Sequence, residues 1–272
     1  MEVFDDRRCV LGEGPFYDDR TGWIGWVDIT GSRILRRPVT GGPAAEEATP
    51  DHVGAVVLRE DGTYVTCLAG GVAVGDDELI PFPPAPTLIR ANDAKVDPLG
   101  CLWVGTIAYD GSPAVADLFR LEPGADRLVP VLTGLTISNG LGWSPDGSTM
   151  YHIDTPTKQI TAYDFDGLPR GGRPFAEIDD GAPDGMCVDA AGGVWVALFG
   201  GGAVRRYHPD GSLDRVVPVP TPQVTSCAFA GPDLDLLIIT TAARDRPDDP
   251  HAGLTYVHRP GDVGLPGHRF KG

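Results

Sequence analysis

The stretch LGWSPDGSTMYHID, residues 141–154, has the signature of a β-hairpin. Two short runs with apolar and aromatic residues flank an Asp-Gly pair, which is a turn that joins antiparallel strands at little conformational cost. No stretch of the chain places apolar residues at helical spacing over more than about one turn. These patterns predict an all-β protein that is built from hairpins.

The hairpin pattern recurs five more times along the 272 residues. The turns lie 38 to 47 residues apart and are centred on Gly22, Gly62, Gly100, Gly147, Gly193 and Leu234. A period of about 40–50 residues made of strands is typical of a β-propeller, in which each repeat forms one four-stranded blade. We therefore predict a six-bladed β-propeller of four-stranded antiparallel blades, occupying residues 1–272 as one domain. A β-sandwich of about 12 strands is the alternative, but it would need no constant period.

The sixth predicted blade has no outermost strand at its C-terminal end. Residues Val3–Val10 precede the first hairpin, and they could supply the missing strand. The N-terminus would then close the ring of blades.

Charge and composition exclude some classes of binding partner. The chain has 22 basic and 38 acidic residues, a formal net charge of −16, which disfavours nucleic acid and anionic membrane surfaces. No apolar run is long enough to span a membrane, and the first residues have no signal-peptide core, so we expect a cytoplasmic protein. The five cysteines form no C-x-x-C pair, and we expect them to be reduced and mostly buried. A cation or a small molecule is the expected ligand.

Oxygen-bearing side chains occupy one repeat position on four of the six predicted blades. Counting back eight or nine residues from the hairpin turns gives Glu13, Asn92, Asn139 and Asp184. In a propeller these positions converge at one mouth of the central channel. Because two carboxylates buried together are costly without a cation, we predict a hard divalent metal held by Glu13, Asn139 and Asp184. The alternative is that these side chains cap strand ends and line a solvated channel.

The same residues lie in motifs that resemble the regucalcin, gluconolactonase and luciferin-regenerating enzyme family. The motifs cover nearly the whole chain and include Gly12-Glu-Gly-Pro15, Arg90-Ala-Asn-Asp-Ala-Lys-Val-Asp97, Ser138-Asn-Gly-Leu-Gly-Trp143 and Pro183-Asp-Gly-Met-Cys-Val-Asp189. The resemblance implies a six-bladed propeller with one divalent cation on Glu13, Asn139 and Asp184. Calcium is the expected ion, with magnesium, manganese or zinc as alternatives. The resemblance also implies that Arg90 and Asn92 contact the substrate.

The activity that this resemblance implies is hydrolysis of a small, sugar-type lactone by water that the metal activates. Asp184 is the expected general base, and Arg90 and Asn92 would hold substrate oxygens. An ion pair with a carboxylate such as Asp110 is the alternative role of Arg90. A serine hydrolase is not expected, because no histidine lies near Ser138 in the sequence.

Three departures from the family pattern leave the substrate open. Ala94 stands where a glycine is common, Gly142 replaces a frequent carboxylate, and Asp110 is the nearest candidate for an acidic substrate contact. Three other readings therefore remain: a metal-dependent phosphotriesterase, a pathway-specific lactonase acting on a larger substrate, and a propeller that binds a ligand without turnover.

Overall fold

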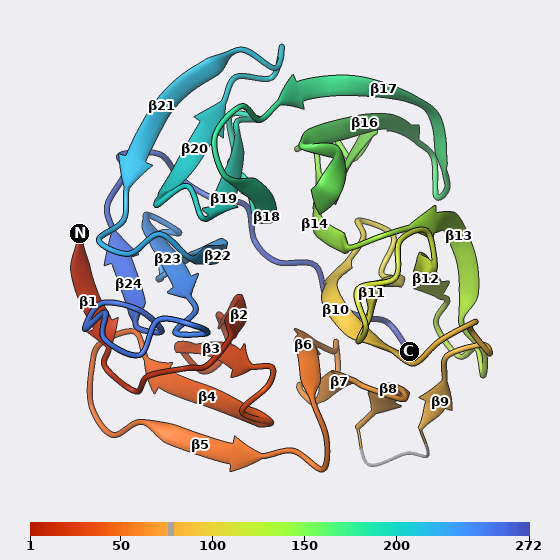
Figure 1. Ribbon diagram of the computed structural model, residues 1–272, viewed down its shortest axis with the longest axis horizontal. Helices are drawn as coiled ribbons and strands as arrows, with labels where there is room; N and C mark the ends of the chain where they lie inside the picture. Colours follow the sequence, from red (N-terminus) through yellow and green to blue (C-terminus); the bar gives the residue numbers. More distant parts are fainter. Residues whose placement is uncertain (76–78) are drawn as a thin grey trace.

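Six four-stranded antiparallel sheets form a ring around a central channel (Figure 1). The structure is a computed structural model, and it describes residues 1–75 and 79–272. The six-bladed propeller predicted from the turn spacing is confirmed. The described residues contain one short helix, η1 (Thr155–Thr157), and none that is long and apolar enough to cross a membrane.

Each blade runs from an inner strand at the channel to an outer strand at the rim. The first three blades are β2 (Gly12–Asp18), β3 (Trp23–Asp28), β4 (Arg33–Pro38) and β5 (Ala45–Ala48); β6 (Val53–Leu58), β7 (Tyr64–Leu68), β8 (Gly71–Val74) and β9 (Ile80–Pro81); and β10 (Ile89–Val96), β11 (Leu102–Ala108), β12 (Ala116–Leu121) and β13 (Val129–Leu135).

Blades 4 to 6 follow the same plan, and the last one is closed by the N-terminus. They consist of β14 (Ser138–Trp143), β15 (Thr149–Asp154), β16 (Gln159–Phe165) and β17 (Pro169–Glu177); β18 (Ala182–Val188), β19 (Val194–Phe199), β20 (Ala203–Tyr207) and β21 (Leu213–Pro218); and β22 (Val224–Ala230), β23 (Leu236–Thr241), β24 (Thr255–His258) and β1 (Glu2–Asp5). Val3 pairs with Tyr256, so the prediction that the N-terminal residues complete the sixth blade is confirmed. The strand begins and ends earlier than Val3–Val10.

Buried aspartates tie the hairpins of two blades to their tryptophans. Asp189 accepts hydrogen bonds from the backbone N–H groups of Ala191 and Gly193 through Oδ1, and from Trp195 Nε1 and Arg206 Nε through Oδ2. Asp97 likewise accepts from Trp103 Nε1 and from two backbone N–H groups in blade 3. Both indoles are fully buried. These tryptophans therefore belong to the packing of the blades.

Candidate functional site

All six inner strands lose register with their neighbours at the same point of the repeat. The breaks lie between Glu13 and Phe16, Val53 and Ala55, Ala91 and Ala94, Asn139 and Leu141, Pro183 and Met186, and Val224 and Ser226. A β-bulge bends the strand and redirects a side chain out of the regular alternation. The four oxygen donors predicted from the repeat all lie at such a break.

Hydrogen bonds join the donors of blades 3, 4 and 5 into one chain. Asn92 Nδ2 donates to Asn139 Oδ1 at 2.9 Å, and Asn139 Nδ2 donates to Thr155 Oγ1 at 2.9 Å. The Thr155 hydroxyl in turn donates to the carbonyl oxygen of Pro183 at 2.8 Å, next to Asp184. This chain fixes the amide of Asn139 so that its nitrogen is used and its oxygen keeps one lone pair.

Two carboxyl groups, Glu13 and Asp184, are buried together beside that amide. Burial, with a smaller contribution from the charge of Asp93, raises the pKa of Glu13 to about 8. Burial first and the Glu13 charge second raise the pKa of Asp184 well above its usual value. The nearby positive charge of Arg90 opposes the increase for Glu13 but does not offset burial.

Asp93 is a third buried carboxyl whose charge acts on Glu13, and its role was not predicted from the sequence. It follows Asn92 within the bulge of β10, and its Oδ2 atom is buried without a hydrogen-bond partner. Burial raises its pKa as well. The acidic side chain was the one sign in the sequence that Asp93 could belong to the site. On a regular strand, however, Asp93 and Asn92 would face opposite sides of the sheet. Only the bulge brings Asp93 close enough to act on Glu13.

The donor set fits a hard divalent cation. In the described ranges no three His, Cys, Asp or Glu side chains gather into a metal-ligand cluster. A site here would therefore use the carboxylates of Glu13 and Asp184 with the amide oxygen of Asn139, an all-oxygen set of the kind that calcium and magnesium accept. The raised pKa values and the orphaned Asp93 oxygen are what a charge-deficient cation site would show.

Arg90 lies on β10 two residues before Asn92, and its guanidinium is buried. Nη1 donates to the carbonyl oxygen of Ala91 at 2.8 Å and to Asn92 Oδ1 at 3.0 Å. Burial lowers the pKa of Arg90, and the nearby Tyr109, Glu13 and Asp184 oppose that effect. Arg90 thus orients Asn92, and its guanidinium places a positive charge beside the buried carboxyls.

Asp110 is the predicted site residue that lies apart from this group. Its carboxylate is exposed and accepts hydrogen bonds from the Ser112 N–H in its own loop after β11 and from Thr87 Oγ1, which lies just before β10. Among the described residues, no salt bridge joins it to Arg90. Its neighbour Tyr109 lies closer to Arg90 and shares a 3.0 Å hydrogen bond with His52 Nδ1.

Ser138 has a histidine beside it in the fold, although none lies near it in the sequence. His152 Nε2 lies 3.0 Å from Ser138 Oγ, because β14 and β15 are paired and bring together residues 14 positions apart. Burial lowers the pKa of His152 to about 4, so the imidazole is neutral at pH 7. Ser138 is completely buried, and a β-carbon at Gly105 would lie 2.5 Å from its Oγ. The pair packs blades 3 and 4 together and cannot reach a substrate.

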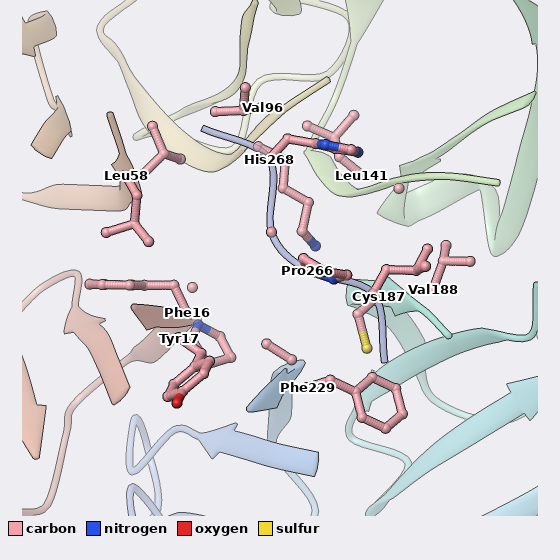
Figure 2. Close-up of a pocket in the computed structure, with 18 of the residues that line it drawn as sticks. Phe16, Tyr17, Leu58, Val96, Leu141, Cys187, Val188, Phe229, Pro266 and His268 are labelled. Carbon is pink, nitrogen blue, oxygen red and sulfur yellow. The ribbon is translucent and has the colours of Figure 1, made fainter. Parts of the chain in front are cut away.

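Past the oxygen donors, the channel widens into a cavity of about 570 Å³ (Figure 2). Its walls are mainly apolar and come from the later residues of the inner strands, such as Phe16, Leu58 and Val188. The C-terminal segment crosses this end of the channel: Gly264 pairs with Asp189, and Phe270 pairs with Arg59. The oxygen donors therefore face the opposite, N-terminal end of the inner strands.

Comparison with known proteins settles which propellers this one resembles. Residues 11–243 match the SMP-30/gluconolactonase/LRE-like region. The chain belongs to the SMP-30/gluconolactonase/LRE-like family. The match begins just before Glu13 and includes every inner strand, so it covers all four oxygen donors.

Members of this family include enzymes named for lactones. The chain is 34% identical to a 6-deoxy-6-sulfogluconolactonase of Pseudomonas putida, over 96% of this chain and 94% of that protein. It is 37% identical to a pentonolactonase of Haloferax volcanii, over 88% and 84% of the two chains. The solved structure of a calcium-binding protein, regucalcin, from Agrobacterium tumefaciens superposes with a TM-score of 0.90 at 27% identity, covering 99% of this chain and 97% of that one.

Proposed function

We propose that this chain is a lactone hydrolase that opens a small, sugar-type lactone with the help of one divalent cation, most simply Ca²⁺. Glu13, Asn139 and Asp184 would hold the cation. The observation that carries the proposal is the burial of two carboxyls with raised pKa values beside a fixed amide oxygen and Arg90. Family membership supports the reaction, since relatives over most of the chain are named lactonases.

A bound divalent cation supplies a Lewis acid that polarises the lactone carbonyl and lowers the pKa of water. Glu13 and Asp184 would be ionised when they hold such a cation. Magnesium, manganese and zinc remain alternatives to calcium. A carboxylate and amide oxygen set favours hard ions over zinc, and the calcium-binding relative supports calcium.

The side chains of this protein would perform the proton transfer and the positioning. Asp184 takes a proton from the attacking water as the water oxygen bonds to the carbonyl carbon, and the ring C–O bond then breaks. Asp184 then returns that proton to the leaving alkoxide, which becomes the hydroxyl of the acid product, and the carboxylate is regenerated.

Arg90 and Asn92 would orient the lactone. Arg90 has a planar guanidinium with donors beyond the Nη1 group that holds Asn92, and these can meet ring or hydroxyl oxygens. The Asn92 amide is already held at both ends, by Arg90 Nη1 and by Asn139 Oδ1. A held amide loses little conformational entropy when a substrate binds.

A substrate panel tests the proposal. Purified protein is assayed against sugar γ- and δ-lactones, an aromatic lactone and a phosphotriester, with Ca²⁺ and with chelator. Cation-dependent opening of the sugar lactones, above the other substrates, is the expected result. Turnover of the phosphotriester alone would show that the protein is a phosphotriesterase rather than a lactonase. Tight binding without turnover of any substrate would favour a ligand-binding propeller.

A further inference from the structure

Two of the five cysteines meet across neighbouring blades. Cys187 on β18 and Cys227 on β22 are 40 residues apart in the chain, and their sulfur atoms lie 3.7 Å apart. All five cysteines are free and buried. In the described part of the chain, this is the only hydrogen bond between two thiols. A pair of buried thiols in contact differs from an isolated cysteine, because the product of its oxidation can be a disulfide.

The two thiols are not equally accessible. Cys187 lines the 570 Å³ cavity, where Figure 2 shows it close to Phe229 and Pro266. Cys227 is almost completely buried and is not part of the cavity wall, and its Sγ also contacts the carbonyl oxygen of Trp195 at 3.6 Å. The hydrogen bond to Cys187 and then burial raise the pKa of Cys227, so this thiol is the less reactive of the two until a sulfenic acid forms beside it. A small reagent in the cavity therefore meets Cys187 first.

We propose that Cys187 and Cys227 are an oxidative modification site, at which a small peroxide entering the cavity produces a reversible disulfide between blades 5 and 6. The Cys187 sulfur attacks one peroxide oxygen, the O–O bond breaks, and Cys187 becomes a sulfenic acid while the other oxygen leaves as water or an alcohol. The Cys227 sulfur then attacks the Cys187 sulfur, the S–O bond breaks, and water leaves with the Cys227 proton. The two thiols lose two electrons and two protons, and the peroxide takes both.

The geometry favours this pair over the other cysteines. The sulfurs must approach from 3.7 Å to about 2.05 Å, which side-chain rotation and a small strand movement can supply. Cys67 lies in the core between blades 2 and 3, and the Cys101 sulfur instead accepts a hydrogen bond from Arg120. A sulfenic acid on either has no thiol partner in contact to resolve it.

The disulfide would act on the candidate site through β18. Asp184 lies three residues before Cys187 on this strand. Between them, Gly185 packs so closely on β22 that a β-carbon there would lie 2.1 Å from Ser226 Oγ. Since the two strands are already in close contact at this point, a movement of β18 that closes the S–S bond would be passed along the strand to Asp184. Because a displacement of about 1 Å in a catalytic group can cost about 10²-fold in rate, we expect oxidation to lower lactone turnover by about tenfold or more.

Peptide mapping of the folded wild-type protein tests the modification. Reduced protein is treated with hydrogen peroxide, alkylated, denatured, alkylated again with a heavy reagent and digested for mass spectrometry. The expected result is a peptide linked through Cys187 and Cys227, with Cys9, Cys67 and Cys101 still alkylated, and its loss after dithiothreitol. A linked peptide with other cysteines, or five free thiols after peroxide, would overturn the proposal.

Variants locate the chemistry and its effect. Cys227→Ser should stop at a Cys187 sulfenic acid that dimedone traps, whereas the control Cys67→Ser should form the wild-type cross-link. Lactone turnover of peroxide-treated wild type should fall and recover with dithiothreitol, while treated Cys67→Ser behaves in the same way. Equal loss in treated Cys227→Ser, which cannot form the cross-link, would show that the disulfide is not the cause.

Discussion

The amide nitrogen of Asn92 donates a 2.9 Å hydrogen bond to Oδ1 of Asn139, from blade 3 to blade 4. The bond links the residue expected to contact substrate to one expected to hold the cation. Arg90 holds the other end of the Asn92 amide, so the three side chains behave as one unit. A substitution at Arg90 or Asn92 should therefore also change the affinity of the proposed cation site.

Substitution of Asn92 by Ala should weaken cation binding although Asn92 is not proposed as a ligand. The loss of a partner that orients a metal ligand typically costs about 10–100-fold in affinity, and we expect a decrease in that range. Titration calorimetry with Ca²⁺ measures it. Asp110→Ala is the matched control, because its carboxylate contacts only its own loop and Thr87, and its cation affinity should be unchanged. Wild-type affinity in Asn92→Ala would mean that Asn139 needs no support.

The cation-free protein should lose stability as the pH rises from about 4.5 to about 8. The pKa of Glu13 is raised to about 8 in the fold from 4.5 as its ordinary value, so the folded state binds this proton more tightly than the unfolded state does. The associated stability is complete below about pH 4.5 and is lost as the pH passes through 8. Melting temperatures measured in chelator across this range test the trend.

Bound cation should oppose this loss of stability at high pH, because the cation binds the ionised form of Glu13. Affinity for Ca²⁺ should increase with pH up to about 8, and the cation should raise the melting temperature most at the alkaline end. Glu13→Gln is the control, and both pH trends should be reduced in it. Identical pH trends in wild type and Glu13→Gln would exclude Glu13 as the titrating group.

Arg90 should contribute mainly to substrate binding. Arg90→Ala is expected to raise KM with a smaller change in kcat, if the guanidinium holds the ground state and the transition state alike. Arg90→Lys should restore little, since an ammonium group lacks the planar pair of donors. Steady-state kinetics at saturating Ca²⁺ separate these effects from cation loss. A decrease in kcat alone would instead assign Arg90 to the transition state.

The buried aspartate of blade 5 should matter more for stability than an exposed aspartate in a comparable turn. Asp189 accepts four hydrogen bonds and pairs with Arg206, which is itself mostly buried. Arg206 keeps Asp214 as a partner, but replacement of Asp189 by Ala leaves the Trp195 indole N–H and two backbone N–H groups without theirs. Since an unsatisfied buried donor costs about 1–3 kcal/mol, we expect a loss of about 3 kcal/mol in the free energy of unfolding. Asp146→Ala, at an exposed turn in blade 4, should cost much less, because the donors that it leaves can bond to water. Equal losses in urea unfolding would contradict the assignment.

The repeat made the blades and the four oxygen donors predictable from the sequence. Turn residues recur once per blade, so their spacing reports the architecture, and equivalent positions converge on the channel. Asp93 was missed because its direction depends on a bulge that breaks the strand alternation. The Ser138–His152 and Cys187–Cys227 pairs were missed because strand pairing and blade packing bring them together across 14 and 40 residues. The course of the C-terminal segment across the channel was not predicted, because this segment lies outside the repeat and has no periodic pattern of its own.

The most direct test of cation-assisted lactone hydrolysis compares wild type with Asp184→Asn after removal of metal. Chelator-treated protein is titrated with Ca²⁺, and kcat for the best sugar lactone is taken at saturating cation, so that weaker binding in the variant is corrected. We expect no activity in metal-free wild type, recovery with Ca²⁺, and a kcat at least about 10²-fold lower in Asp184→Asn. Full activity of wild type without cation, or a wild-type kcat in Asp184→Asn, would contradict the account.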